Sequence, residues 1–187
     1  MVSILLLLKC QGKKRLHIYT EEQRQKLILF LFERILNVLK GMNVYVLTPD
    51  DIPDKGCTVI RDEWRDINKV ITKARSQISD DVLILPCDLP FVERDNINAL
   101  RGEKVMIVPS QNGGTNALYL PDAVEFETQF GKNSFQNHID SLHKKNLEYK
   151  ILESDDFRDI DTEEDILWAL EHRRDSEFSQ FVTERLE

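Results

Sequence analysis

The sequence lacks the patterns that define several large classes of protein. Its three cysteines are an odd number and form no CxxC pair, which argues against a disulfide framework and a cysteine zinc site. The opening apolar run, Val2 to Leu8, is far shorter than the roughly 20 residues of a membrane-spanning helix. Basic residues follow this run and no small-residue cleavage site appears, so we do not expect a signal peptide. A reducing compartment, the cytoplasm, is the predicted location, without a membrane partner.

Charge and missing motifs narrow the chemistry further. The net charge of −8 argues against a nucleic-acid partner, because duplex binding rests on many Lys and Arg contacts to phosphate. No GxGxxG follows a strand pattern and no GxxxxGK[ST] is present, which disfavours dinucleotide-dependent oxidoreductases and P-loop NTPases. The histidines form no HExxH motif and no paired metal-ligand spacing. We expect them to be solvated or to cap helices: His17, His138, His143 and His172.

What the chain does have is enough length and apolar content for one domain over residues 1–187, of which 41% are hydrophobic. Short apolar runs rich in β-branched residues alternate with amphipathic helical patterns. This alternation predicts an α/β fold with a mostly parallel central sheet and helices on both faces. Strands are expected at Val2–Leu8, Val44–Leu47, Thr58–Ile60, Val82–Leu85, Val105–Val108, Ala117–Leu120 and Tyr149–Leu152.

The clearest helix signal follows Thr20. Together with Gln23 three residues later, Thr20 resembles a capping box, and Gly41 is expected to close the helix. A second helix has an apolar face from Ile67 to Ile78. The charged segment Arg173 to Glu187 is expected to fray or to pack on a partner. Further helices are predicted near Arg94–Leu100, Ser134–Lys145 and Thr162–His172.

The strongest local signal for chemistry is Asp88. In open parallel sheets ligands bind beyond the carboxyl ends of the strands. There the run Val82–Leu85 leads directly to Asp88, and the flanking Pro86 and Pro90 stiffen the loop. A carboxylate at this edge suits Mg²⁺, which binds through one or two carboxylates and substrate phosphates. The alternative is an aspartate that caps the following turn.

A second pair of carboxylates occurs late in the chain. Asp159 and Asp161 alternate, so in an extended segment both side chains lie on one face and could complete a metal site. The alternative is that Asp161 or Thr162 caps the helix that follows.

Three further segments suit anions. The basic loop from Lys9 to Arg15 follows the first strand and could neutralise a triphosphate, although charge runs are often only solvated surface. Gly113–Asn116 and Phe130–Phe135 combine glycines with a serine at a helix start, which suits a phosphate or carboxylate. A hairpin turn and an ordinary N-cap are the alternatives.

Taken together, these residues resemble the 2-phospho-L-lactate guanylyltransferase family, whose GT-A-like nucleotidyltransferase fold is shared with sugar-nucleotide pyrophosphorylases. The loop from Lys9 to Arg15 is shorter than usual for the family, and Asp66 and Asn133 stand where glycines are expected. Asn133 is a mild change, because Asn tolerates a left-handed backbone. The matching segments, in order, are Lys13–Leu16, Asp66–Asn68, Pro86–Pro90, Gly113–Leu118, Phe130–Phe135 and Asp159–Asp165.

The resemblance implies a role for individual residues. It implies that Mg²⁺ is bound by Asp88, Asp159 and Asp161. It implies that the phosphorylated three-carbon acid is held by Thr115, Gly131 and Ser134. The residues that would face the nucleotide are Lys13, Arg15 and Asn68, joined by Lys9 of the basic loop. Among all of these, Asp88, Lys13 and Arg15 would act directly in catalysis.

The reaction that the resemblance implies joins the GMP part of GTP to 2-phospholactate, with release of pyrophosphate, on the route to coenzyme F420. A homodimer is implied as well. Two alternatives for the acceptor stay open, phosphoenolpyruvate and 3-phosphoglycerate. A non-catalytic nucleotide-binding or dimer-forming module is the alternative from another class. The complete set of three aspartates favours the enzyme.

Overall fold

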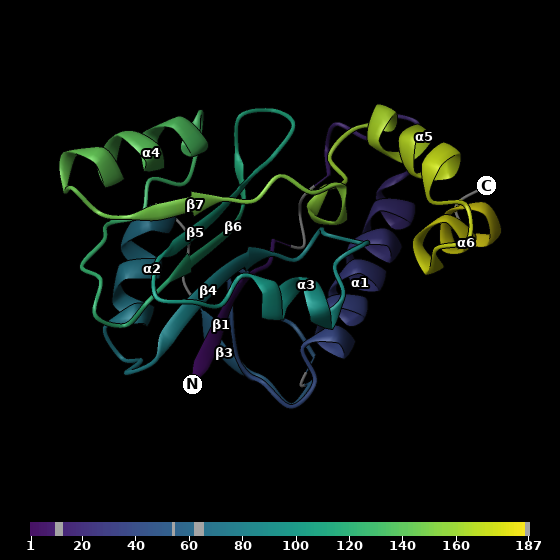
Figure 1. Ribbon diagram of the computed structural model, residues 1–187. Helices are drawn as coiled ribbons and strands as arrows, with labels where there is room; N and C mark the ends of the chain where they lie inside the picture. The colour runs from purple at the N-terminus through teal and green to yellow at the C-terminus, as the bar shows by residue number, and fades with distance from the viewer. Residues whose placement is uncertain (10–12, 54, 62–65, 186–187) are drawn as a thin grey trace.

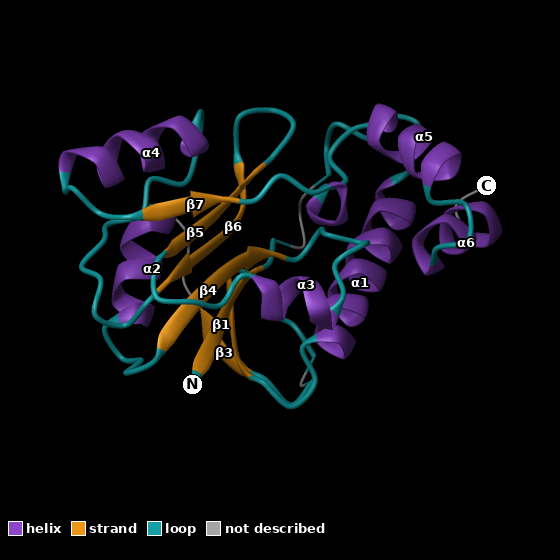
Figure 2. Ribbon diagram, in the orientation of Figure 1, coloured by secondary structure: helices purple, strands orange, loops and turns teal. Residues whose placement is uncertain are grey.

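The computed structural model describes residues 1–187 except 10–12, 54, 62–65 and 186–187. Figure 2 shows how strands and helices alternate along most of the chain. The strands are β1 (Val2–Leu7), β2 (Asn43–Thr48), β3 (Thr58–Arg61), β4 (Asp81–Pro86), β5 (Val105–Pro109), β6 (Thr115–Leu120) and β7 (Tyr149–Ile151). The helices are α1 (Glu21–Val38), α2 (Ile67–Arg75), α3 (Arg94–Ala99), α4 (Ser134–Lys144), α5 (Glu163–His172) and α6 (Glu177–Arg185), with a 3-10 turn at Asp155–Phe157.

Within the described residues the strands form one sheet in the order β3-β2-β1-β4-β6-β5-β7 (Figure 1). β6 is antiparallel to both of its neighbours, β4 and β5, whereas every other pairing is parallel. The predicted α/β fold with a mostly parallel sheet is confirmed. Because β6 runs in the opposite direction, its first residues lie at the edge where β4 ends, as the pairing of Ile84 with Leu118 requires.

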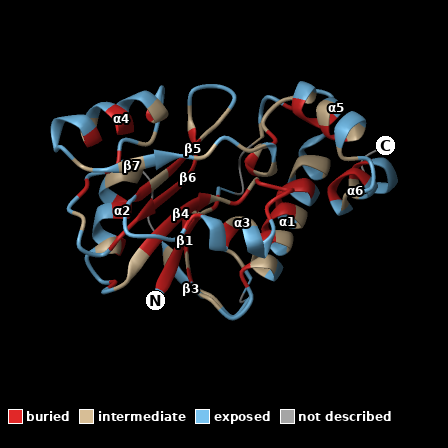
Figure 3. Ribbon diagram, viewed as in Figure 1, coloured by how far each residue is buried: buried red, intermediate tan, exposed pale blue. Residues whose placement is uncertain are grey.

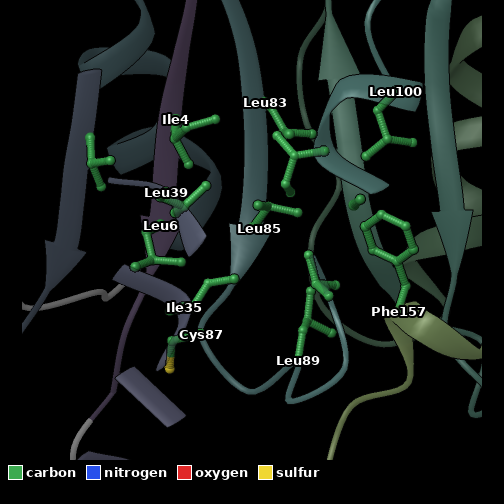
Figure 4. Packing of buried hydrophobic residues seen from close by; sticks show 14 of the residues in the cluster. Ile4, Leu6, Ile35, Leu39, Leu83, Leu85, Cys87, Leu89, Leu100 and Phe157 are labelled. Atoms are coloured by element: carbon green, nitrogen blue, oxygen red, sulfur yellow. The ribbon is translucent and has the colours of Figure 1, made fainter. Parts of the chain in front are cut away.

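Both faces of the sheet are buried, as Figure 3 shows for the central strands. Successive side chains of a strand point to opposite faces. Ile4 and Leu6 therefore pack with α1 and α3, and Leu5 packs with α2 and α4. Figure 4 shows the first of these two layers, in which Leu83 and Leu85 of β4 also lie. Truncating such a residue to alanine typically costs about 2–5 kcal/mol, so this double core holds the sheet edge in place.

The predicted capping box at the start of α1 is confirmed. Thr20 accepts a hydrogen bond from the Gln23 backbone N–H, and the Gln23 side chain accepts one from the Thr20 backbone N–H. Gly41 lies just beyond the helix with φ of 81°, a left-handed conformation that suits glycine. The capping box thereby fixes the end of the β1–α1 loop that leads into α1.

The C-terminal helix α6 packs on its own chain. Phe178 and Val182 are buried in a third cluster with residues of α1 and α5, and the Phe30 and Phe181 rings stack with centroids 4.2 Å apart. The expectation that this segment frays or seeks a partner is wrong for Glu177–Arg185, because its apolar face is already covered. Among the described residues, no helix has both the length and the apolar content needed to cross a membrane.

Candidate active site

The predicted site residues converge on one edge of the sheet. β1 and β4 are parallel neighbours, with Leu7 opposite Pro86, so both strands end at this edge. The antiparallel strand β6 begins there with Thr115. In Figure 1 the loop that leads into α1 lies beside α5 at this edge, and a hydrogen bond from the Ile18 backbone N–H to Glu163 joins them at 2.9 Å. Segments far apart in the sequence therefore surround one region.

Asp88 is held in place by its neighbours in the chain. Cys87 and Leu89 on either side are 8% and 1% exposed and pack in the core with Phe157 (Figure 4). The Ile160 backbone N–H donates to the Asp88 carbonyl oxygen at 3.2 Å. This bond brings the segment that carries Asp159 and Asp161 alongside Asp88, as the sequence predicted for a shared site.

Lys13 joins two of the aspartates. Its ammonium donates to Asp88 Oδ2 and to Asp161 Oδ1, the latter at 2.8 Å, and its side chain is only 7% exposed. Burial alone would lower the pKa of Lys13, but the charges and hydrogen bonds of Asp88 and Asp161 outweigh it and raise the pKa. Lys13 is therefore charged at every physiological pH. We call Lys13, Asp88, Asp159 and Asp161 the carboxylate cluster.

Asp159 is positioned by Asn116, a residue that the sequence analysis did not assign. Asn116 Nδ2 donates to Asp159 Oδ1 at 2.9 Å and to the Phe157 carbonyl oxygen at 2.8 Å. Burial and the nearby charge of Asp88 raise the pKa of Asp159 to about 6, against the opposing hydrogen bond from Asn116. Repulsion between carboxylates thus remains in the cluster although Lys13 is present.

The carboxylate cluster has the donor chemistry for a divalent cation, although it is not a preformed metal site. Within the described ranges, no three His, Cys, Asp or Glu side chains are arranged to hold a metal ion as they stand. The ammonium of Lys13 instead lies between Asp88 and Asp161. Asp88 Oδ1 is buried and has no hydrogen-bond partner in the described structure. Three carboxylates and one ammonium leave an excess of negative charge, and hard oxygen donors of this kind suit Mg²⁺.

The structure decides the capping roles that were the alternatives for Asp161 and Asp88. Thr162, not Asp161, caps α5: its hydroxyl accepts from the Asp165 backbone N–H, and the Asp165 side chain accepts from the Thr162 backbone N–H. The Asp161 side chain is thus directed to Lys13. The alternative for Asp88 was a cap on the following turn, but Asp88 Oδ1 has no hydrogen-bond partner in the described structure, and Oδ2 accepts from Lys13.

A second, uncharged group is built around Thr115, the residue before Asn116 in β6. Thr115 Oγ1 is 3.0 Å from His138 Nδ1, and Ser134 Oγ donates to Thr115 Oγ1 at 3.1 Å. All three side chains are buried. We call Thr115, Ser134 and His138 the hydroxyl cluster. It unites two of the residues predicted to hold the acid.

The loops around the hydroxyl cluster explain how it forms. Gly113, with φ of 76°, turns the chain between the antiparallel strands β5 and β6, so the hairpin alternative is correct. The Gly113 carbonyl also accepts from the Phe135 backbone N–H at 3.2 Å, which fastens the hairpin to the start of α4. Gly131 and Asn133 adopt φ of 132° and 55°, and Asn133 therefore takes the left-handed conformation anticipated for it.

Two expectations about α4 need correction. Ser134 is the first residue of the helix, not its N-cap, which is Asn133; the Ser134 hydroxyl is used on Thr115 instead. His138 was expected to be solvated or to cap a helix, but it is fully buried, with both ring nitrogens bonded. Ser134 and His138 are four residues apart, which places both side chains on the same face of a helix. This spacing was the signal in the sequence that could have linked His138 to the site.

The residues predicted to face the nucleotide divide into two groups. Lys9 and Arg15 are exposed beyond the end of β1. Asn68 instead uses its amide on the loop before Gly131, donating to the Phe130 carbonyl at 3.0 Å and accepting from the Phe130 N–H at 2.7 Å. A nucleotide role for these residues stays a prediction. Residues 10–12 of the basic loop lie outside the described residues.

The fold described above is shared with transferases of known structure. A proposed nucleotide-diphospho-sugar transferase from Desulfovibrio desulfuricans G20 superposes with a TM-score of 0.73, at 16% identity over 98% of this chain and 94% of that one. 4-Diphosphocytidyl-2C-methyl-D-erythritol synthase from Anaerococcus prevotii DSM 20548 gives a TM-score of 0.57, at 14% identity over 93% of this chain and 98% of that one. At these identities the likeness concerns the fold.

The sequence comparison defines the family. The family profile described as "Guanylyl transferase CofC like" matches residues 2–185. A 2-phospho-L-lactate guanylyltransferase from Methanocaldococcus sp. (strain FS406-22) is 33% identical over 159 residues, which cover 79% of this chain and 70% of the relative. The chain therefore belongs to the CofC-like guanylyltransferase family, as the resemblance of its motifs indicated.

Proposed function

We propose that this protein transfers the guanylyl group of GTP to the phosphate of (2S)-2-phospholactate, which gives lactyl-2-diphospho-5′-guanosine and pyrophosphate on the route to coenzyme F420. Membership of the family supports the guanylyl donor. The name of the relative with 33% identity supports the acceptor. The arrangement of the sheet edge supports a reaction between two anions.

One observation carries the proposal. Thr115 and Asn116 are consecutive residues of β6, and their side chains belong to different clusters: Thr115 to the hydroxyl cluster and Asn116, through Asp159, to the carboxylate cluster. Neighbouring residues of a strand are separated by only about 3.3 Å along its axis. Because successive side chains of a strand point to opposite faces, an acid held by the first cluster and a nucleotide phosphate held at the second would meet across the beginning of β6, at the edge of the sheet.

The acid would be held without a positively charged side chain in the hydroxyl cluster. Thr115 and Ser134 offer hydroxyls, and Gly131 lets the backbone approach closely because it carries no side chain. Ser134 is also the first residue of α4, an 11-residue helix whose amino end carries a partial positive charge. These groups suit the phosphate or carboxylate of a three-carbon acid.

The proposed chemistry needs no general base. A phosphate oxygen of the acid is already anionic at neutral pH and forms a bond to the α-phosphorus of GTP. The bond from the α-phosphorus to the bridging oxygen breaks, and pyrophosphate leaves with the electron pair. What remains is to bring two anions together in line and to neutralise their charge. Lys9, Lys13 and Arg15, at the end of β1, would neutralise the triphosphate and the departing pyrophosphate.

We include Mg²⁺ in the proposal. Asp88, Asp159 and Asp161 would hold it, and the unpartnered Asp88 Oδ1 and the raised pKa of Asp159 both favour a cation at this position. Bound there, the ion would supply charge neutralisation at the α-phosphate. Because Lys13 pairs with two of these carboxylates, it and the ion would compete for them, and Lys13→Gln should bind Mg²⁺ more tightly than wild type in calorimetric titration without nucleotide.

The decisive experiment is to incubate the protein with GTP, Mg²⁺ and each of 2-phospholactate, phosphoenolpyruvate and 3-phosphoglycerate in separate reactions. Pyrophosphate release and the mass of the product are measured. We expect the highest kcat/KM with 2-phospholactate, lower rates when ATP or CTP replaces GTP, and no turnover after chelation until Mg²⁺ is returned. A higher kcat/KM with one of the other two acids would change the proposed acceptor but not the proposed guanylyl transfer. Stabilisation by GTP without pyrophosphate release from any acid would show a binding module instead.

Assembly and location complete the proposal. The homodimer that the resemblance implies is to be tested by light scattering during gel filtration, where a monomeric mass at micromolar concentration would contradict it. A reaction that uses GTP fits the cytoplasmic location predicted from the sequence. Fractionation of cells that produce the protein tests that location.

A further inference from the structure

His138 is a buried polar side chain to which the proposed reaction assigns no role. It lies on the inner face of α4 and is fully buried. The Phe126 and Phe130 rings pack around it, with centroids 5.8 Å and 5.0 Å from the imidazole. An apolar side chain of similar size would fill this position without the cost of removing an imidazole from water. Its hydrogen bonds must therefore explain the histidine.

Those hydrogen bonds fix the position of the proton. The Gln129 backbone N–H, which can only donate, is 2.8 Å from His138 Nε2. Nε2 is therefore the unprotonated nitrogen, and in a neutral imidazole Nδ1 then carries the proton. Burial lowers the pKa of His138 to about 4, so the ring is neutral at physiological pH. Nδ1 thus donates to Thr115 Oγ1, 3.0 Å away.

This assignment determines what the Thr115 hydroxyl can do. A hydroxyl has two acceptor positions and one proton to donate. Thr115 Oγ1 accepts from His138 Nδ1 and from Ser134 Oγ, so both acceptor positions are filled. The remaining function of the hydroxyl is to donate its own proton. A hydroxyl that can only donate favours a partner that accepts, such as an anionic oxygen, over a partner that itself donates.

We propose that His138 is a positioning residue for the acid, holding the Thr115 hydroxyl as a dedicated hydrogen-bond donor to an anionic oxygen of the phospho-acid. This inference rests on the proposed function, since it concerns the acceptor substrate of that reaction. His138 itself does not touch the acid. It acts through Thr115, and its loss should weaken binding of the acid without affecting GTP.

Two substitutions separate the two ring nitrogens. In His138→Asn the amide Nδ2 takes the place of Nδ1 and still donates to Thr115. In His138→Gln the longer side chain reaches the place of Nε2, where its carbonyl oxygen accepts from Gln129, and the donor to Thr115 is lost. We expect KM for the acid to rise about tenfold in His138→Gln, the scale of one hydrogen bond, and to stay within about threefold of wild type in His138→Asn. KM for GTP should not change in either.

Two controls accompany this pair. His143→Gln makes the same change on the same helix at an exposed position and should leave both KM values unaltered. In a Thr115→Val background, His138→Gln should add no further rise in KM for the acid, because the group through which it acts is gone. Melting temperatures of all variants show whether a change in KM accompanies a loss of folding.

A spectroscopic measurement keeps the inference testable if the variants fold poorly. In wild-type protein with ¹⁵N-labelled histidine, NMR at pH 7 should show His138 neutral with its proton on Nδ1. A charged ring, or a proton on Nε2, would overturn the inference, as would equal rises in KM for His138→Asn and His138→Gln or a wild-type KM in His138→Gln. Absence of turnover in wild type with every acid would instead refute the proposed function.

Discussion

The two clusters at the edge of the sheet are linked to consecutive residues of β6, Thr115 and Asn116, but differ in charge and in completeness. In the carboxylate cluster, one ammonium faces three carboxylates, Asp88 Oδ1 has no partner in the described structure, and the pKa of Asp159 is raised. In the hydroxyl cluster every group is uncharged, and both ring nitrogens of His138 are bonded. The first is therefore unsatisfied in the protein alone, whereas the second is already formed.

This difference suits a reaction between two anions. A site that holds both reactants with cations alone would bind them without distinguishing one from the other. In the proposed reaction a cation is needed on one side only, and the other side offers neutral donors and the amino end of α4. Donors that are already in place need no reorganisation when the anion arrives, which is the condition for effective electrostatic stabilisation. Changes in the two clusters should consequently have different effects.

The largest effect is expected from Asp88→Asn, which removes a charge from the carboxylate cluster with little change in shape. We expect kcat/KM to fall about a hundredfold or more, the scale for loss of one key electrostatic group. Initial rates of pyrophosphate release measure it, with Asp95→Asn on the exposed side of α3 as the matched control. Full activity in Asp88→Asn would remove Asp88 from the proposed metal site.

The hydroxyl cluster should respond to pH through stability. The pKa of His138 is about 4 in the folded protein, against 6.5 for an ordinary histidine. Between these values the unfolded chain binds a proton that the folded chain does not, so stability falls as the pH is lowered through this window. From pH 7 to pH 5 wild type should lose about 2 kcal/mol more than His138→Asn, which has no ring to protonate.

Urea unfolding of both proteins at each pH measures this difference. Groups that titrate in both proteins cancel when the unfolding free energy of the variant is subtracted from that of wild type. Only the contribution of the His138 ring remains. Parallel pH profiles for wild type and His138→Asn would mean that the ring is not held neutral by burial, and the contrast between the clusters would be lost.

The sequence predicted the strands and helices well because their signals are local. Runs such as Val82–Leu85 are apolar on both faces, and Thr20 with Gln23 forms a cap within one turn. The direction of β6 was not predictable in this way. Its run Ala117–Leu120 is buried on both faces, and such a pattern is the same for a parallel and an antiparallel strand. Only the pairing with β4 and β5 decides the direction.

The site was predictable where a residue follows a strand, and less so where contacts join distant segments. Asp88 was found because it directly follows β4. The pairing of Lys13 with Asp88 and Asp161 joins residues 75 and 148 positions apart, and no local pattern contains it. Asn116 and His138 were missed because their roles depend on what they bind, namely Asp159 and Thr115. Buried polar residues acquire their function from partners that only the fold supplies.

Asn116→Ala should have an intermediate effect, since it removes support from a cluster without removing a charge. Asp159 loses its hydrogen bond, and the buried Phe157 carbonyl loses a donor. We expect kcat/KM to fall about tenfold, the lower end of the range for groups that orient metal ligands. Mg²⁺ titrations and initial rates measure it, with the exposed Asn137→Ala as control. If the Mg²⁺ affinity and the rate both stay at wild-type values, Asn116 does not position Asp159.

The smallest effect is expected at the hairpin before Thr115. A Cβ atom at Gly114 would lie 2.7 Å from Ser110 Oγ, closer than real contacts allow, so Gly114→Ala must displace the Ser110 side chain. That side chain accepts the Gly114 backbone N–H at 2.8 Å. Loss of this bond should cost about 1 kcal/mol of unfolding free energy and raise KM for the acid slightly, with no change in KM for GTP.

In a Ser110→Ala background the obstacle and the bond are both absent, so Gly114→Ala should then cost nothing further. An equal cost in both backgrounds would place the strain elsewhere in the hairpin, and a change in KM for GTP would mean that the two clusters are coupled through β6.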